Sequence, residues 1–346
     1  MKKLLLLVAA LAIVSCESEP EAPKDYVTLS GKIENKNSDS LTIRSRTYSK
    51  TIKVNEDGTF KDTLKVEKGI FYLSDGSEST GIYLENDFDL NLTLNTKMFD
   101  ETIKYTGKGA IHSNFLAEDA LKTEKMLDMD FLTSLDSTGL EKEIEKITKD
   151  LKEFYNSKKE VDSTIIALKL KDVEPMLGMY KQYAGASIAL KKELPRGKVS
   201  PAFEGYENYD GSKTSLDDLK GKYVYIDVWA TWCGPCKAEI PSLKKLEKKY
   251  HDKNIQFVSL SIDDDRAHGG SWEKAKESWK AMIKDKELGG IQIFAPNGWK
   301  SDFITAYKIN GIPRFILVDP EGKIVSPDAP RPSNPKLVEL FDELKI

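Results

Sequence analysis

The sequence predicts an α/β C-terminal domain preceded by a small antiparallel β-domain and a helical region, in a chain of 346 residues. Three patterns support this fold class. Short alternating apolar runs fill residues 25–107, amphipathic helical spacing follows over 108–195, and strand-like and helix-like runs alternate over 196–346. Alternation of the last kind is typical of a sheet that is covered by helices.

The N-terminal region, 25–107, has the pattern of half-buried strands. Apolar residues alternate with polar ones at 27–33, 41–43 and 90–94, and the tetrapeptide at 55–58 is a turn signal. Short strands with regular turns predict a small antiparallel sandwich or barrel. No catalytic constellation stands out here. Two roles are therefore open for this region. It is either a spacer with a dimerisation surface or a client-binding domain.

The helical region, 108–195, contains apolar residues at spacings of four and three, with Glu and Lys between them. These residues are Leu140, Ile144, Ile147, Leu151 and Phe154. The spacing predicts an amphipathic helix packed on its neighbours, with a coiled coil as the alternative. We expect Pro175, Gly178 and Gly185 to interrupt the helical pattern that follows. The segment 194–198 marks the boundary with the C-terminal domain.

Two cysteines, Cys233 and Cys236, lie between a strand-like run at 223–229 and a helix-like run at 237–250. In this context the C-x-x-C spacing predicts a redox-active pair. Cys233 is expected at the helix N-terminus, where unpaired N–H groups and the helix dipole stabilise a thiolate. We therefore predict that Cys233 attacks a disulfide and that Cys236 resolves the mixed disulfide that forms.

A zinc site and a purely structural disulfide are the alternatives for the cysteine pair. A structural zinc ion needs four ligands. The chain has no second cysteine pair and only three scattered histidines, which are His112, His251 and His268. A disulfide between residues three apart constrains little of the chain. Redox chemistry is the preferred hypothesis, and the sequence predicts no metal and no cofactor.

The third cysteine, Cys16, follows a basic start and an apolar run at 4–14 that is too short to span a bilayer. This pattern resembles a bacterial lipoprotein signal of residues 1–16, with Cys16 as the lipidated residue and a flexible tether at 17–24. The alternative is a secretory signal cut after Ala12. Either signal predicts an extracytoplasmic protein of the cell envelope. Lipidation would anchor it to a membrane, facing the periplasm or the cell surface.

Composition excludes some classes of function. The chain has 40% hydrophobic residues, and its 52 Lys and Arg nearly balance its 56 Asp and Glu. A nucleic-acid-binding protein would carry a basic excess or a basic stripe, and neither is present. After the predicted signal, no apolar run is long enough to span a membrane.

Asp227 is an acidic residue within an otherwise apolar strand-like run, six residues before Cys233. Burying a carboxylate is costly, so we expect a raised pKa for Asp227. Proton transfer to or from Cys236 is a use for such a group. The alternative is that Asp227 lies on a solvated face of the strand.

Several C-terminal segments carry a specific family resemblance. They are the Pro-Ala-Phe at 201–203, the runs 216–221, 224–236 and 311–319, and the turn 320–323. Together they resemble the TlpA/ResA-type thioredoxin-like proteins over nearly all of this domain. The resemblance implies a thioredoxin-like fold, thiol chemistry and an anchored extracytoplasmic setting. The β-region is similar to the N-terminal β-domain of Bacteroidota lipoproteins of this kind.

The same resemblance implies roles for individual residues. Pro313 matches the family's cis-proline, which lies against the cysteine pair and pairs with a substrate backbone. Glu239 matches a glutamate that lines the active site and tunes the thiols, although an ordinary exposed helix residue is the alternative. Asp227 is similar to the buried aspartate of thioredoxins. The implied substrate-binding residues are Trp232, Gly234, Pro235, Ile312 and Pro313.

The leading functional hypothesis is a thiol:disulfide oxidoreductase that acts as a reductase. The Gly-Pro dipeptide between the cysteines is found in reducing thioredoxins, whose potential is about −270 mV. The expected partners are a disulfide-bearing client protein and a membrane electron-exporting thiol reductase as donor, and a homodimer is also expected to be possible. The family resemblance implies cytochrome c maturation as one client pathway.

Two alternatives compete with this hypothesis. A thiol peroxidase of the wider family carries a threonine three residues before its reactive cysteine, but Ala230 occupies that position and Thr231 is one residue off. A non-enzymatic lipoprotein would instead bind its ligand through the β-region and use the thioredoxin-like part as a scaffold.

Overall fold

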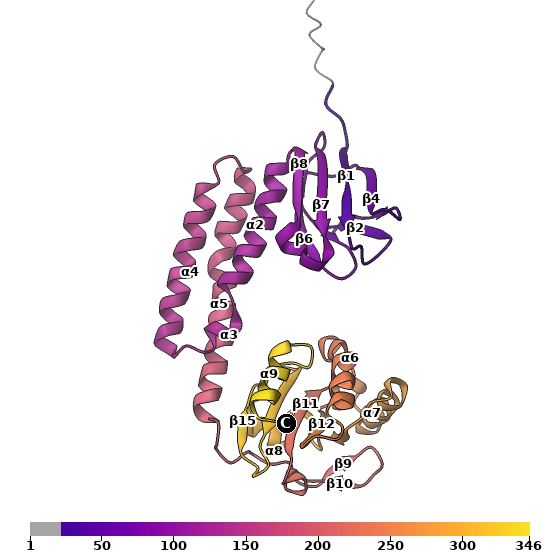
Figure 1. The fold of residues 1–346 in the computed structure, drawn as a ribbon, viewed down its shortest axis with the longest axis vertical. Helices are drawn as coiled ribbons and strands as arrows, with labels where there is room; N and C mark the ends of the chain where they lie inside the picture. Colours follow the sequence, from indigo (N-terminus) through magenta and orange to yellow (C-terminus); the bar gives the residue numbers. More distant parts are fainter. Residues whose placement is uncertain (1–21) are drawn as a thin grey trace, which may run out of the picture. The chain divides into compact units, whose positions relative to one another are not determined.

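A computed structural model describes residues 22–346 of the protein (Figure 1). The predicted lipidation site Cys16 and most of the tether lie outside these residues. Contacts divide the chain into two compact units. One holds residues up to Asp128 together with Ile147–Glu174, and the other holds Met129–Lys146 together with Pro175–Ile346. Within residues 22–346, no helix is both long and apolar enough to cross a membrane.

The first unit contains two four-stranded sheets, with strand orders β4-β1-β7-β8 and β3-β2-β5-β6. The strands are β1 (Val27–Glu34), β2 (Ser40–Arg44), β3 (Ser49–Lys53), β4 (Thr59–Leu64), β5 (Gly69–Ser74), β6 (Ser79–Leu84), β7 (Asp89–Asn95) and β8 (Lys104–Lys108). The predicted alternation is clear in β7, whose three leucines are buried. One pair departs from the antiparallel pattern, because β1 and β7 run parallel. The long connection between them, which includes the second sheet, makes this crossover possible.

Helices follow the strands. They are α2 (Ala110–Met126), α3 (Met129–Leu132), α4 (Ser137–Ser157) and α5 (Ser163–Glu193), after the short segments η1 (Thr96–Met98) and α1 (Phe99–Thr102). Leu140, Ile147 and Leu151 of α4 are buried, which confirms the predicted amphipathic helix. The predicted interruptions at Pro175, Gly178 and Gly185 are wrong, because α5 continues through all three. Burial of Val173 and Leu177 on either side offsets the one backbone hydrogen bond that a proline removes.

The second unit is built on a seven-stranded mixed sheet with the order β10-β9-β13-β12-β11-β14-β15. The strands are β9 (Tyr206–Asn208), β10 (Lys213–Thr214), β11 (Tyr223–Trp229), β12 (Ile255–Ser261), β13 (Ile291–Phe294), β14 (Arg314–Val318) and β15 (Ile324–Ser326). Strands β11, β12 and β13 are parallel, and β14 is antiparallel to β11.

Helices cover both faces of this sheet, as the predicted thioredoxin-like fold requires (Figure 1). They are α6 (Gly234–Lys249), α7 (Trp272–Lys286), α8 (Asp302–Ala306) and α9 (Pro335–Glu343), with the short segments η2 (Leu216–Leu219), η3 (Arg266–His268) and η4 (Gly298–Lys300). Apolar residues of α6 and α9 form one core with Tyr225 and Phe257 of the sheet. Helices α7 and α8 form the other core, in which Trp279 is fully buried.

Strands, then helices, then an α/β region follow one another along the chain, but the helical region is not a compact unit of its own. The strands of the β-region end at Lys108 and α5 ends at Glu193, close to the predicted limits. Helices α4 and α5 are each divided between the two compact units. The segment 263–290 contains α7, whose buried residues pack against the sheet.

Candidate active site

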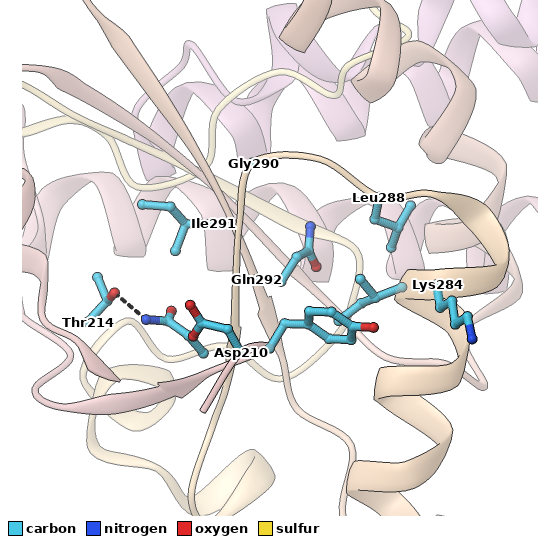
Figure 2. Close-up of a pocket in the computed structure, with 10 residues that line it drawn as sticks. Asp210, Thr214, Lys284, Leu288, Gly290, Ile291 and Gln292 are labelled. Atoms are coloured by element: carbon cyan, nitrogen blue, oxygen red, sulfur yellow. Dashed lines mark hydrogen bonds between the residues drawn. The ribbon is translucent and has the colours of Figure 1, made fainter. Parts of the chain in front are cut away.

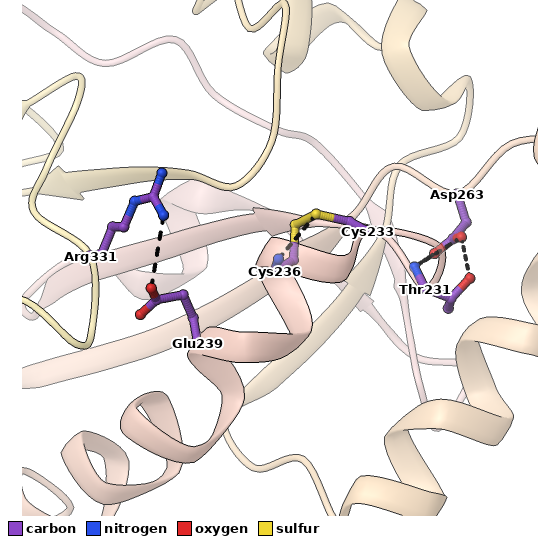
Figure 3. Close-up of a disulfide and its surroundings, with 6 residues drawn as sticks. All are labelled: Thr231, Cys233, Cys236, Glu239, Asp263 and Arg331. Carbon is purple, nitrogen blue, oxygen red and sulfur yellow. Dashed lines mark hydrogen bonds and ion pairs between the residues drawn. A yellow bond between two sulfur atoms is a disulfide. The ribbon is translucent and has the colours of Figure 1, made fainter. Parts of the chain in front are cut away.

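The two cysteines lie where strand β11 is followed by helix α6. Cys233 is the N-cap of α6, and its Sγ accepts a hydrogen bond from the Cys236 backbone nitrogen over 3.1 Å. A disulfide joins them, with Cα atoms 5.3 Å apart (Figure 3). Gly234 and Pro235 form the start of the helix, where the missing N–H of proline costs no hydrogen bond. Each cysteine residue is only 4% exposed, so the pair is largely covered.

A buried carboxylate that the sequence analysis did not single out holds the loop before Cys233. Asp263 is fully buried and accepts hydrogen bonds from the Thr231 hydroxyl over 2.6 Å and the Thr231 backbone nitrogen over 3.0 Å. The Ser261 hydroxyl donates to the same carboxylate over 2.7 Å. These donors offset the cost of burying a charge. The sequence signal that could have indicated this buried carboxylate is the run of three aspartates, 263–265, directly after an apolar strand.

Asp227 lies on the face of β11 that helix α6 covers, beside Ser259 of β12. Its burial, with repulsion from the carboxylates of Glu239 and Glu247, raises the pKa of Asp227 to about 8. The predicted raised pKa is therefore confirmed. Asp227 and Cys236 line the same narrow cavity of about 10 Å³, which is room for about one water molecule. The structure thus brings the two groups of the predicted proton transfer to one cavity.

Glu239 is buried, and its carboxylate is bound to the loop before α9. It accepts hydrogen bonds from the backbone nitrogen and the hydroxyl of Ser333, each over 2.9 Å. Arg331 Nη1 lies 4.0 Å from Glu239 Oε1. Figure 3 shows the carboxylate directed toward Arg331 and away from the two sulfur atoms. Glu239 is therefore not an ordinary exposed helix residue, and its direct contacts link α6 to this loop.

The Ile312–Pro313 peptide bond is cis, as predicted. Both residues line a groove of about 540 Å³, with the C-terminal part of α5 as its other wall. The Ser187 hydroxyl of α5 donates to Asp328 over 3.3 Å, and Arg314 pairs with the same carboxylate over 3.4 Å. These contacts fix the two walls of the groove to each other.

Trp232 is 45% exposed, which is unusual for so large an apolar side chain. Its ring lies 6.5 Å from the ring of Trp299, a residue that the sequence analysis did not single out. By contrast Trp229 is 2% exposed and belongs to the core. Trp232 therefore offers an apolar contact surface directly beside Cys233.

Another pocket, of about 450 Å³, lies between the β9–β10 hairpin, the end of α7 and strand β13 (Figure 2). It contains none of the site residues predicted from the sequence. Gln292 and Leu288 line this pocket and also the narrow cavity that holds Asp227. The Gln292 amide nitrogen donates to the Gly289 carbonyl over 2.6 Å, which holds the side chain between the two spaces.

Comparison with known proteins finds a family and relatives that match part of this chain. Residues 195–338 match the Redoxin family. The thiol-disulfide oxidoreductase ResA of Bacillus cereus is 30% identical over 135 residues, which make up 39% of this chain and 70% of that protein. The protein of the same name from Bacillus subtilis is 26% identical over 140 residues, 40% of this chain and 70% of its own. A solved thiol-disulfide oxidoreductase from Bacteroides fragilis is 29% identical and is matched over 42% of this chain and 99% of its own, with a TM-score of 0.36.

Proposed function

This chain belongs to the family of the ResA thiol-disulfide oxidoreductases, and we propose that it reduces disulfides of client proteins outside the cytoplasm. The observation that carries the proposal is the cysteine pair at the N-terminus of α6, with Asp227 and Cys236 in one cavity. A cysteine that reacts as a nucleophile needs a stabilised thiolate, and its partner needs a route for its proton.

The reaction begins when the Cys233 thiolate attacks one sulfur of the client disulfide. A mixed disulfide forms and the first client thiolate leaves. Cys236 then loses its proton to the Asp227 carboxylate, and its sulfur attacks Cys233 Sγ. The Cys233–Cys236 disulfide forms, the second client thiolate leaves, and two electrons have passed to the client.

The groove beside Ile312 and Pro313 supports the assignment of a polypeptide client. Its two walls are fixed to each other through Asp328, and such a preformed groove can hold an extended segment without reorganising. The half-exposed ring of Trp232 adds an apolar contact on the client. The substrate-binding assignments of Trp232, Gly234, Pro235, Ile312 and Pro313 are part of this proposal.

The sequence supports the location and the electron supply that we propose. The apolar run 4–14 and Cys16 support a lipoprotein signal, and lipidation would anchor the protein to a membrane of the cell envelope. An extracytoplasmic pair that reduces its clients must itself be reduced again. We propose a membrane thiol reductase that exports electrons as the donor. The anchor is tested by labelling cells with a lipid precursor. Label in the wild type that is lost in a Cys16→Ser variant would support lipidation, and no label in the wild type would refute it.

Peroxidase activity is disfavoured by the surroundings of Thr231. Its hydroxyl donates to Asp263 over 2.6 Å, so it is engaged away from any substrate at Cys233. Ala230 is fully buried and has no polar side chain to offer to a peroxide.

The proposed activity is tested by reduction of insulin, a soluble protein with disulfides, by the protein without residues 1–16 in the presence of a dithiol donor. We expect catalysed reduction by the wild type and none by a Cys233→Ser variant. Equal rates with and without the protein would overturn the proposal. Consumption of hydrogen peroxide is measured in parallel, and a rapid rate there would favour the peroxidase.

A further inference from the structure

We propose that Glu247 is the outer carboxyl group of a proton path that connects Cys236, through Asp227, with solvent. The proposal deepens the proposed function, on which it rests, since it concerns the proton that Cys236 must lose before it attacks the mixed disulfide. Glu247 contacts no reacting sulfur and is therefore a positioning residue, which acts through Asp227.

The residues of this path share one face of helix α6. Cys236, Ile240, Leu243 and Glu247 follow one another at spacings of four, three and four, which places them in one stripe along the helix. The stripe faces Asp227 of β11 and Ser259 of β12, and all six residues line the narrow cavity. Cys236 is buried, whereas Glu247 is partly exposed. One cavity is therefore lined both by the buried resolving cysteine and by the partly exposed carboxyl group of Glu247.

The backbone after α7 gives Glu247 its place at the cavity. A Cβ atom on Gly289 would lie 2.6 Å from Glu247 Oε2, and one on Gly290 would lie 3.0 Å from Oε1. Two successive glycines thus leave room for the carboxyl group against the main chain. A side chain at Gly289 would displace it.

Glu247 is not part of a salt bridge that would keep it ionised. Within residues 22–346 its carboxylate forms no hydrogen bond and no ion pair. Lys244 is the cation that faces it, but the Lys244 ammonium donates to the Lys286 carbonyl over 2.8 Å. The ammonium also lies 3.8 Å from Glu287, which is 87% exposed. The other charged group near the path is Glu239, which is bound to Ser333.

The electrostatics of the two carboxyl groups suit proton exchange near neutral pH. Burial raises the pKa of Glu247 to about 7, and Lys244 opposes the shift. Burial and repulsion from Glu239 and Glu247 raise the pKa of Asp227 to about 8. A proton passes readily between acids of similar strength, and the pair titrates as a coupled system.

In the proposed step, the proton of Cys236 goes to Asp227 as the sulfur attacks Cys233 Sγ. The S–S bond between Cys233 and the client breaks while the bond between Cys233 and Cys236 forms. Asp227 then passes its proton to the Glu247 carboxylate, through water in the cavity, and Glu247 releases it to solvent. Asp227 is thereby ready for the next turnover, and the client thiolate takes its own proton from solvent.

The test uses the reduced protein without residues 1–16 and an aromatic disulfide whose released thiolate is coloured. Attack by Cys233 releases the first thiolate, and attack by Cys236 releases the second. The two phases therefore separate the step that needs the path from the step that does not. Glu247→Gln removes the titrating group at nearly constant shape. Glu287→Gln is the matched control, because it removes a carboxylate near Lys244 that does not line the cavity.

We expect Glu247→Gln to leave the rate of the first phase unchanged and to slow the second phase about tenfold at neutral pH. This loss is about ten times smaller than the loss expected when a direct proton acceptor is removed. In this variant, the inflection near pH 7 in the pH profile of the second-phase rate should disappear. Gly289→Ala, which displaces the carboxyl group without removing it, should slow the second phase as well. The pKa of Asp227, measured by NMR, should fall in Glu247→Gln because a negative neighbour is lost. Glu287→Gln should change none of these.

A second phase with the wild-type rate and pH profile in Glu247→Gln would overturn the proposal. Equal slowing of both phases would also overturn it, because the effect would then be structural. A wild-type protein that releases no thiolate would instead refute the proposed function itself, and the path with it.

Discussion

Thr231 donates two hydrogen bonds to Asp263, one from its hydroxyl over 2.6 Å and one from its backbone nitrogen over 3.0 Å. This pair ties the residue two positions before Cys233 to the loop that follows strand β12. Asp263 is fully buried, so the cysteine loop has a fixed attachment to the sheet. The position of Cys233 at the start of α6 thus depends on a residue 30 positions away in the sequence.

We predict that Asp263→Asn lowers the free energy of unfolding by about 3 kcal/mol, because an amide cannot accept from all of the buried donors. Urea unfolding of the oxidised protein measures this. Asp265→Asn changes the same charge two residues away and should cost less than about 0.5 kcal/mol, as most surface substitutions do. Equal stability of the Asp263 variant and the wild type would contradict the attachment.

Cys236→Ser should stop the reaction halfway. The Cys233 thiolate still attacks the client, but no second thiol is present to resolve the mixed disulfide. The covalent complex should therefore accumulate, visible as a slower band on a non-reducing gel that a reductant removes. Cys233→Ser should form no such complex. Accumulation in Cys233→Ser instead would reverse the roles that we give to the two cysteines.

Asp227→Asn should make the protein more stable at high pH. The pKa of Asp227 is raised to about 8 in the folded protein, against about 3.9 in an unfolded chain. The wild type therefore loses stability as the pH rises from about 4 to about 8, and asparagine avoids this loss. We expect a gain on the order of 2–4 kcal/mol above pH 8 and none below pH 4.

The same variant should resolve mixed disulfides roughly 100-fold more slowly at neutral pH, because the proton acceptor for Cys236 is lost. Unfolding curves at several pH values, together with the second phase of thiolate release, measure both effects. A stability difference that does not change with pH would show that Asp227 is not a buried titrating group.

Trp232→Ala should weaken the reaction with protein clients more than the reaction with small disulfides. The ring is 45% exposed beside Cys233, so truncating it removes a client contact and little of the core. We expect KM for a protein client to rise about tenfold, the effect of about 1.4 kcal/mol of lost binding. Trp299→Ala is the comparison, since its ring lies 6.5 Å from that of Trp232 and packs against the core. Equal losses with both substrates would argue against a client surface.

The sequence predicted the parts of the site that are local in the chain. The C-x-x-C motif, the strand before it and the helix after it are contiguous, so Cys233 could be placed at a helix N-terminus. Asp227 could be identified because a carboxylate stands out in an apolar strand. The cis bond at Pro313 was predicted from the family resemblance alone, since the trans form is favoured for X–Pro bonds in general.

The contacts that the sequence could not reveal join residues far apart in the chain. Glu239 is held by Ser333, 94 residues away, and no local pattern links the two. The parallel pairing of β1 with β7 depends on a crossover that local alternation does not encode. Helix α5 passes Pro175 because the apolar residues around it are buried. In each case, tertiary packing decides what local propensity leaves open.

The reduction potential of the Cys233–Cys236 pair tests the proposed direction of electron flow most directly. The protein without residues 1–16 is equilibrated in thiol–disulfide buffers, and its thiol state is read by alkylation. We predict a two-electron transition below about −230 mV, in the range of reducing thioredoxins. A transition near about −120 mV would make the protein an oxidant that installs disulfides and would contradict the account.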